Sequence, residues 1–125
     1  MRHVFDSLSN RVIGLALEVH RHLGPGLLES TYAQCLAHEL SLAGIRFKKE
    51  WPLPVEYKGL KLDCGFRVDF LIDDELILEI KSVEKLLGIH DAQLLTYMKL
   101  SRIKTGLLIN FNTVLLRQGI RRLVL

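Results

Sequence analysis

Features that mark secreted and membrane proteins are scarce in this chain of 125 residues. It has only two cysteines, Cys35 and Cys64, and nothing marks them as a pair, so we expect reduced thiols in a cytoplasmic protein. No apolar run approaches the length of a membrane span, so we expect no membrane partner. The first ten residues, MRHVFDSLSN, lack the apolar core of a signal peptide.

Repeats, low-complexity tracts and linkers are also absent, so we expect residues 1–125 to form a single domain with a substantial core. Neither sign of charge dominates, because the formal net charge is +3 and the sequence pI is about 9.0. This mild basicity permits a polyanionic partner without requiring one. We interpret the arginines near the C-terminus, Arg117, Arg121 and Arg122, as a solvated sheet edge and not as a nucleic-acid patch.

What the sequence does contain is the stretch 66–82, FRVDFLIDDELILEIKS, which predicts two short strands joined by an acidic turn. Side chains along a strand alternate between the two faces of a sheet. Val68, Phe70 and Ile72 should therefore share one face, with Asp69 on the opposite face. Ionisable groups on strands this apolar are costly unless each meets a partner or an ion.

The register of this hairpin decides whether its charges meet. A two-residue loop at 73–74 would pair Asp69 with Leu78, and Glu79 would then point to the other face. A three-residue loop at 73–75 would pair Asp69 with Glu79, with Cβ atoms roughly 5 Å apart. Such loops need one left-handed residue, which Asp tolerates. We predict the three-residue loop because it concentrates the charges.

Two carboxylates brought that close repel each other unless a cation or a proton lies between them. A compact set of oxygen ligands suits magnesium or manganese. Lys81, two residues after Glu79, should face the same pocket and could hold a phosphate or a water molecule. The hairpin therefore predicts a small acidic centre with one cationic neighbour.

Apolar periodicity and breaker residues define the other elements. We expect helices at about 9–23, 27–43 and 90–102, and strands at about 45–51, 60–62, 104–111 and 120–125. Ser9 or Asn10 should cap the first helix, and the GPG turn at 24–26 should end it and allow close backbone approach. A helix between two strands fits a crossover connection. The order predicts an α/β fold in which a mixed sheet, an antiparallel hairpin with a parallel addition, is flanked by helices.

Four further polar residues are candidates for the site. Glu29 falls on the buried stripe of the second helix, although a place in the first turn, favoured by the helix dipole, explains it equally well. Gln93 and Tyr97 lie on one stripe of the last helix and could orient a phosphate, a base or a carboxylate; a core Tyr and a surface Gln are the alternative. Glu50 could be a further acidic ligand, but we interpret it as an exposed strand residue.

Asp69 followed after nine residues by Glu79-x-Lys81 resembles the core of the PD-(D/E)xK nuclease superfamily, with Val68 where many members have proline. The segment 26–32, GLLESTY, resembles the GxxExxY signature of a small bacterial and archaeal branch of that superfamily. The resemblance continues through VHRHLGPGLLE, QLLTYMKL, GLLINFN and the terminal GIRR, and so covers nearly the whole chain. Gln93 and Tyr97 also resemble the Q-x-x-x-Y element of helicase-associated nucleases of the same fold.

The resemblance implies a restriction-endonuclease-like core and a nuclease that cuts DNA or RNA with Mg²⁺ or Mn²⁺. The implied catalytic residues are Glu29, Asp69, Glu79 and Lys81; the implied metal ligands are Asp69, Glu79 and the Ile80 carbonyl; the implied supporting residues are Gln93, Tyr97 and, more weakly, His20. For His20 a structural hydrogen bond is the alternative.

Two other hypotheses stay open at this point. The chain could be a nucleic-acid-binding or protein-interaction module that keeps the site without efficient cleavage. Alternatively, Asp69 and Lys81 could form a structural ion pair. The small size of the chain leaves little surface to grip a long duplex, which favours a homodimer, a partner subunit or a small substrate.

Overall fold

A computed structural model describes residues 6–125, so part of the N-terminal segment examined for a signal peptide lies outside the described residues. The elements are α1 (Ser7–Leu23), α2 (Glu29–Leu42), β1 (Phe47–Pro52), β2 (Val55–Tyr57), β3 (Leu60–Leu62), β4 (Arg67–Ile72), β5 (Leu76–Lys81), α3 (Gly88–Ser101), β6 (Thr105–Asn110), the 3₁₀ helix η1 (Leu116–Gly119) and β7 (Ile120–Val124). Their types and order confirm the predicted sequence of elements.

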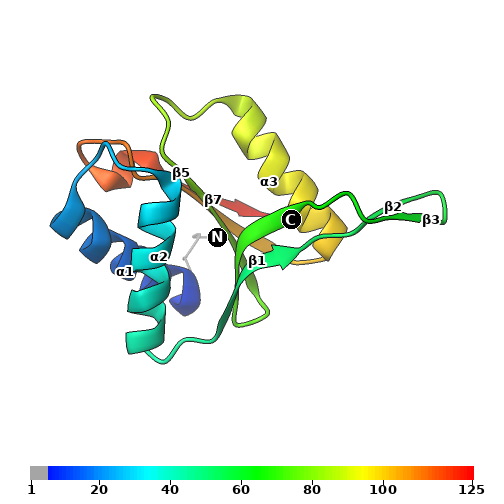
Figure 1. Cartoon of the computed structure of the whole chain (residues 1–125), viewed down its shortest axis with the longest axis horizontal. Helices are drawn as coiled ribbons and strands as arrows, with labels where there is room; N and C mark the ends of the chain where they lie inside the picture. The colour runs from blue at the N-terminus through cyan, green and yellow to red at the C-terminus, as the bar shows by residue number, and fades with distance from the viewer. Residues whose placement is uncertain (1–5) are drawn as a thin grey trace, which may run out of the picture.

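Five strands form one mixed sheet in the order β1-β4-β5-β6-β7, and β2 and β3 pair separately as a ribbon that projects from the body (Figure 1). Strands β5 and β6 are parallel and are joined through α3, while the other neighbours in the sheet are antiparallel. The expected antiparallel hairpin with a parallel addition is therefore confirmed.

Helices cover both faces of the sheet and divide the core in two. Residues of α1 and α2 pack with one set of strand side chains, and residues of α3 pack with another. Gly106 of β6 allows α3 to approach closely, because a Cβ at this position would lie 2.6 Å from the Met98 sulfur. The sheet thus lies between two helical layers, with α1 and α2 on one face and α3 on the other.

Arginines of β7 hold the starts of two helices. Asp6, and not Ser9 or Asn10 as expected, caps α1: its Oδ1 accepts a hydrogen bond of 2.7 Å from the Ser9 N–H. Arg122 donates to Asp6 Oδ2 at 2.6 Å, and Arg121 pairs with Asp91 in the first turn of α3. The edge predicted to be merely solvated therefore has a structural role.

The GPG turn between α1 and α2 needs its glycines for backbone conformation. Gly24 and Gly26 have φ of 71° and 96°, in the left-handed region, but a Cβ added at either position would have no atom within 4 Å, so the expected close approach is wrong. The buried Tyr32 closes this turn, because its hydroxyl donates to the Gly24 carbonyl (2.6 Å) and accepts from the Leu27 N–H (3.1 Å). The start of α2, with Glu29, is held by this closure.

The β4–β5 turn confirms the predicted register. Ile72 pairs with Leu76, as a three-residue loop requires. Both Asp73 and Asp74 have positive φ, 52° and 56°, where one left-handed residue was expected. The Glu75 N–H donates to the Ile72 carbonyl at 3.0 Å, and with two left-handed residues this is the pattern of a type I′ turn.

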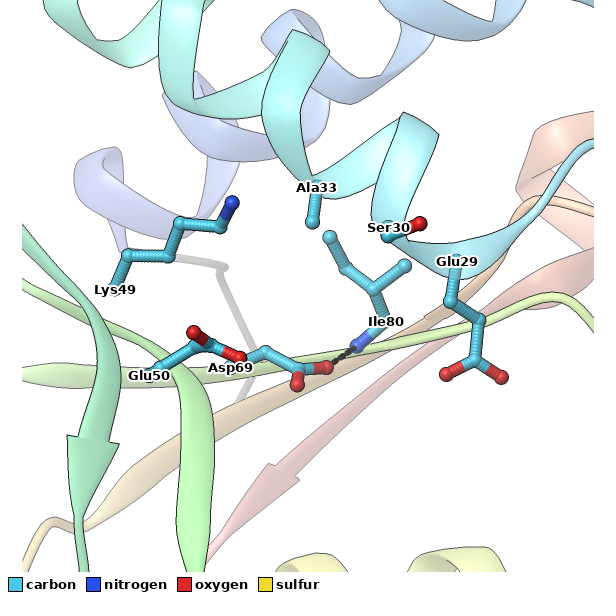
Figure 2. Close-up of a pocket in the computed structure, with 7 residues that line it drawn as sticks. All are labelled: Glu29, Ser30, Ala33, Lys49, Glu50, Asp69 and Ile80. Carbon is cyan, nitrogen blue, oxygen red and sulfur yellow. Dashed lines mark hydrogen bonds between the residues drawn. The ribbon is translucent and has the colours of Figure 1, made fainter.

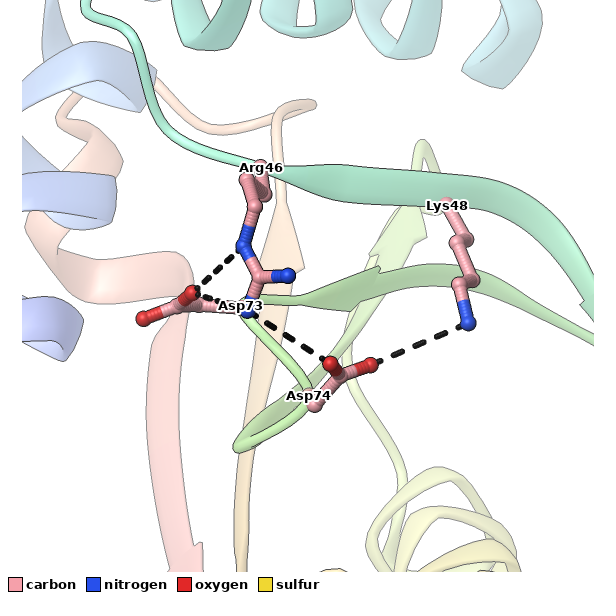
Figure 3. Close-up of polar contacts among 4 residues, drawn as sticks. All are labelled: Arg46, Lys48, Asp73 and Asp74. Carbon is pink, nitrogen blue, oxygen red and sulfur yellow. Dashed lines mark hydrogen bonds and ion pairs between the residues drawn. The ribbon is translucent and has the colours of Figure 1, made fainter.

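Charged side chains of β1 and the preceding residue hold this turn (Figure 3). Arg46 donates to Asp73 Oδ1 through Nε and a terminal nitrogen, at 3.2 and 3.0 Å. Asp74 lies 3.5 Å from Arg46 and 3.8 Å from Lys48. All of these groups are largely exposed, so they define the turn geometry more than they add stability.

Two expectations about the chain's environment can be compared with the structure. Cys35 is half-buried, Cys64 is exposed and both are free, as expected. Within residues 6–125, no helix combines the length and the apolar character that crossing a membrane requires.

Candidate active site

Asp69 lies at an interruption of the sheet. The β1–β4 pairing skips the opposed positions of Glu50 and Asp69, and Glu50 has a left-handed φ of 52°. On the other side, the β4–β5 pairing ends at Phe70 and Leu78. Asp69 therefore belongs to neither ladder, and its backbone and side chain are available for other partners.

The interruption also breaks the alternation of side chains along β4. Phe70 and Ile72 pack in the cluster under α1 and α2, whereas Val68 packs in the cluster under α3. The expectation that these three share a face is wrong, because strict alternation holds only while the ladder is continuous. As a result, Asp69 lines a hollow beneath α2.

Asp69 and Glu79 are joined by two reciprocal hydrogen bonds. The Asp69 N–H donates to Glu79 Oε2 at 2.8 Å, and the Ile80 N–H donates to Asp69 Oδ2 at 2.7 Å. The β4–β5 ladder ends at the neighbouring pair, Phe70 and Leu78. The two carboxylates therefore replace the backbone hydrogen bonds that would continue the ladder. The structure thus brings the two predicted acids together, through the backbone of each other's strand.

Electrostatics show that the positive charge of Lys81 offsets the burial and repulsion of this pair only in part. Burial, followed by the neighbouring Asp69 carboxylate, raises the pKa of Glu79 from 4.5 to about 8. Glu79 is only 5% exposed, and no salt bridge within residues 6–125 includes either acid, which removes the hypothesis of an Asp69–Lys81 ion pair. Burial and then the charges of Glu79 and Asp69 also raise the pKa of Tyr97. The site therefore favours a proton or a cation.

The first hollow has a volume of about 270 Å³ and opens beside Asp69. Its lining consists of Glu29, Ser30, Ala33, Lys49, Glu50, Asp69 and Ile80. Figure 2 shows Glu29 extending from α2 toward the strands that carry Asp69 and Ile80. Glu29 Oε2 accepts a hydrogen bond of 3.3 Å from the Ser82 N–H, so the α2 acid is tied to the chain just after Lys81.

Three residues of this lining, Ser30, Ala33 and Lys49, were not predicted for the site. Glu50, which was considered as a further acidic ligand but interpreted as an exposed strand residue, is exposed as expected and also lines the hollow. Nothing in the sequence reports the β1–β4 register, which alone places Glu50 opposite Asp69. Which residues line the hollow therefore depends on how distant segments of the chain pack together.

A second hollow of about 560 Å³ lies on the α3 side. Its lining consists of Lys81, Ile89, His90, Ala92, Gln93, Thr96 and Tyr97. Lys81 Nζ lies 3.5 Å from Gln93 Oε1. Lys81 was expected in the same pocket as Asp69, but it lines this second hollow together with the predicted supporting residues Gln93 and Tyr97. The buried Glu79 lies in β5, the strand that also carries Lys81.

His20 lies away from both hollows. Its Nε2 is 2.8 Å from the Thr113 carbonyl oxygen, and its ring is tilted against Phe111 with centroids 6.4 Å apart. These contacts tie α1 to the segment after β6. The structure therefore gives His20 the structural hydrogen bond that was its alternative interpretation.

A buried amide holds the segment that follows Lys81. Asn110 Oδ1 accepts from the Val83 N–H at 3.0 Å, and its Nδ2 donates to the Val83 carbonyl at 2.9 Å. Ser82 Oγ donates to the Leu27 carbonyl at 2.6 Å. The chain just after the site is thus fixed on both sides, and no sequence pattern indicated this clamp.

The donor set fits a hard divalent cation. Magnesium commonly binds through one or two carboxylates and keeps several waters, so Asp69 and Glu79 suffice as protein side-chain ligands. The raised pKa of Glu79 agrees, because a bound cation would offset both causes of the shift, the burial of the carboxylate and its repulsion from Asp69. In the described part of the chain, no three His, Cys, Asp or Glu side chains gather as a fuller metal site.

Comparison with known proteins gives one match. A family model described as the PD-(D/E)XK nuclease superfamily matches residues 6–123. No curated protein and no solved structure shows significant similarity. The matched range covers nearly the whole chain, and the α/β architecture, with three α-helices and a five-stranded mixed sheet in residues 6–125, agrees with the restriction-endonuclease-like fold.

Proposed function

Because the chain belongs to the PD-(D/E)XK nuclease superfamily, we propose that it is a metal-dependent nuclease that hydrolyses phosphodiester bonds in DNA or RNA. The observation that carries the proposal is the pair formed by the half-buried Asp69 and the buried Glu79, whose mutual repulsion Lys81 offsets only in part. The segment 26–32, GLLESTY, supports placing the chain in the GxxExxY branch.

The acid pair is proposed to hold Mg²⁺ or Mn²⁺, with the Ile80 carbonyl as a further ligand. Such an ion lowers the pKa of bound water and offsets charge on a phosphate. Asp69 already has one oxygen fixed by the Ile80 N–H, and Glu79 has one fixed by the Asp69 N–H. This mutual support orients both carboxylates before any ligand binds, which limits the cost of ordering them.

Lys81 is proposed to stabilise charge on the phosphate or to position the attacking water. Its neighbour Gln93 holds the ammonium group 3.5 Å away, and Tyr97 lies on the same helix one turn further. Glu29 is proposed as an outer acidic group that orients water at the hollow beneath α2.

Cleavage assays test the proposal. The protein is incubated with single- and double-stranded DNA and RNA, with Mg²⁺, Mn²⁺ or a chelator. Asp69→Asn and Lys81→Met should each lower the rate at least about 100-fold, as expected when a metal ligand or a phosphate contact is lost. Glu84→Gln and Lys85→Met are matched controls, because both residues are exposed and lie in the loop after β5.

One observation favours a second function, a nucleic-acid-binding or protein-interaction module with little cleavage. Lys81 lines a different hollow from Asp69, so the three core residues do not share one open pocket. Under this alternative, oligonucleotides bind with and without metal, and none is cut. Cleavage that requires metal and disappears in Asp69→Asn would exclude it.

A further inference from the structure

The β2–β3 ribbon stands apart from the rest of the molecule. It is a separate two-stranded sheet, and it projects beyond β1 on the side away from α1 and α2 (Figure 1). Its base is anchored, because Leu53 is 3% exposed in the α3-side core and its N–H donates to the Phe66 carbonyl at 2.9 Å. Beyond this anchor the ribbon extends into solvent.

The two faces of the ribbon differ sharply in character. Val55 pairs with Leu62 and Tyr57 pairs with Leu60, while Glu56 pairs with Lys61 between them. Opposed residues of an antiparallel pair lie on the same face, and successive residues lie on opposite faces. One face is therefore formed only by the apolar or aromatic side chains Val55, Tyr57, Leu60 and Leu62, and the charged pair lies on the other.

The apolar face is largely uncovered. Tyr57 is 60% exposed and Leu60 is 57% exposed, and Leu62 and the nearby Phe66 are also exposed. A lone two-stranded hairpin is only marginally stable in water. Contiguous exposed apolar patches on soluble domains mark surfaces that bind a partner. The ribbon therefore has the properties of a docking surface.

We propose that the occupant of this surface is the ribbon of a second copy of the chain, in a two-fold symmetric dimer. A face without charge is complementary to itself, as an isologous interface requires. Nucleic acid fits it poorly, because affinity for phosphates depends on Lys and Arg side chains, and of the two lysines on the ribbon Lys61 lies on the opposite face and Lys58 lies at the tip.

Charge sets the direction in which the two ribbons pack. Lys58 lies at the tip, with its Nζ 5.4 Å from the centre of the Tyr57 ring, and Asp63 lies at the base. In the antiparallel arrangement the tip of each ribbon meets the base of the other, so Lys58 comes near the opposite charge of the partner's Asp63. A parallel arrangement would instead bring the two lysines together.

The available area indicates a reversible dimer. Each exposed side chain is used twice in a two-fold interface, so four or five large apolar side chains bury on the order of 1,000 Å² in total. This value lies at the lower end for specific complexes. We therefore expect monomer and dimer to exchange with protein concentration, and not a permanent assembly.

Sedimentation velocity over a range of protein concentrations tests the dimer. Wild type should shift from monomer to dimer, and Leu60→Gln should raise the dissociation constant at least about tenfold, because each dimer loses two buried leucines. Lys61→Gln is the matched control, since it introduces the same side chain at the next residue on the opposite face. It should dimerise like wild type, and both variants should retain the wild-type circular dichroism spectrum.

Cross-linking tests the arrangement of the two copies. Carbodiimide joins an amine to a carboxylate in contact with it, so it probes the wild-type ribbon with both charges in place. In the dimer it should link Lys58 of one copy to Asp63 of the other, as mass spectrometry of the linked peptides would show, and Asp63→Asn should abolish this link. A linked dimer without the Lys58–Asp63 pair overturns the antiparallel arrangement.

Three outcomes overturn the proposal: a monomer at every concentration, a dimer insensitive to Leu60→Gln, or an equal effect of Lys61→Gln. If instead the protein is monomeric and Leu60→Gln weakens oligonucleotide binding, the ribbon serves nucleic acid. None of these measurements depends on cleavage, so the dimer and the nuclease can fail separately.

Discussion

The carboxylate of Glu79 accepts a hydrogen bond of 2.8 Å from the backbone N–H of Asp69. In return, Asp69 accepts one of 2.7 Å from the N–H that follows Glu79. Two acids that would repel each other in isolation are thus each fixed by the other's strand. The burial of Glu79 beside Asp69, which the charge of Lys81 offsets only in part, is the basis of the first two predictions.

Glu79 should make the stability of the metal-free protein depend on pH. Its pKa is about 8 in the folded protein and near 4.5 when unfolded, so the folded state binds the proton more tightly between these values. Stability should therefore fall as pH rises from about 4.5 to 8, with a slope from this group of up to about 1.4 kcal/mol per pH unit. Urea denaturation in chelator at several pH values measures it.

The control for that experiment is Glu79→Gln, which cannot ionise. Across the same pH window, its free energy of unfolding should rise relative to that of wild type. Parallel profiles for the two proteins would show that the Glu79 carboxyl is not perturbed by burial and by Asp69.

Divalent metal should stabilise the folded protein through the acid pair. Mn²⁺ or Mg²⁺ that binds only the folded state adds RT ln(1 + [metal]/Kd) to the free energy of unfolding, so the melting temperature rises with metal concentration. Thermal unfolding with increasing metal should show this in wild type, and not in Asp69→Asn. Glu84→Gln, outside the site, should respond like wild type. An equal shift in all three proteins would mean that metal binds elsewhere.

Asn110 should contribute strongly to stability. Asn110→Leu removes the acceptor of the Val83 and Asn112 N–H groups and the shorter of the two hydrogen bonds to the Val83 carbonyl, so we expect a loss of about 2–4 kcal/mol in the free energy of unfolding. Asn112→Ala is the comparison, because Asn112 donates only one hydrogen bond of 3.3 Å to the same carbonyl. Urea denaturation should rank the two losses in this order; equal losses would contradict the clamp.

Tyr32→Phe should loosen the turn before α2. The variant keeps the ring, which is stacked on Phe111 with centroids 4.5 Å apart, but loses the hydroxyl that bonds Gly24 and Leu27. We expect a loss of about 1–2 kcal/mol by denaturation. Removing the hydroxyl of the exposed Tyr57 should cost almost nothing. If the two tyrosines behave alike, the turn is not held by Tyr32.

Asp74→Gly should stabilise the β4–β5 turn slightly. Asp74 has a φ of 56°, and glycine is the preferred second residue of such a turn, so a gain of about 0.5 kcal/mol is expected. Asp73→Gly also relaxes a left-handed residue, but it loses both hydrogen bonds from Arg46. Thermal unfolding should therefore favour the first variant, and the opposite order would show that the ion pairs of Asp74 with Arg46 and Lys48 matter more than the hydrogen bonds from Arg46 to Asp73.

Local patterns were sufficient to predict the elements and the register at the centre of the site. Apolar periodicity located the helices, and the demand that buried charges meet selected the loop that places Asp69 near Glu79. Errors at helix starts, such as the cap at Asp6 in place of Ser9, arose because several neighbouring residues can each cap a helix.

The order of residues was enough to identify the buried strands and the two acids that must share a partner, because period and charge are local properties. Three features followed only from the folded chain: alternation breaks at Asp69, Glu50 lies opposite it, and Lys81 lines a separate hollow. Pairing between distant strands and the docking of helices set those features, since they arise from contacts between segments far apart in the chain. The surroundings of the acid pair are therefore a product of the fold.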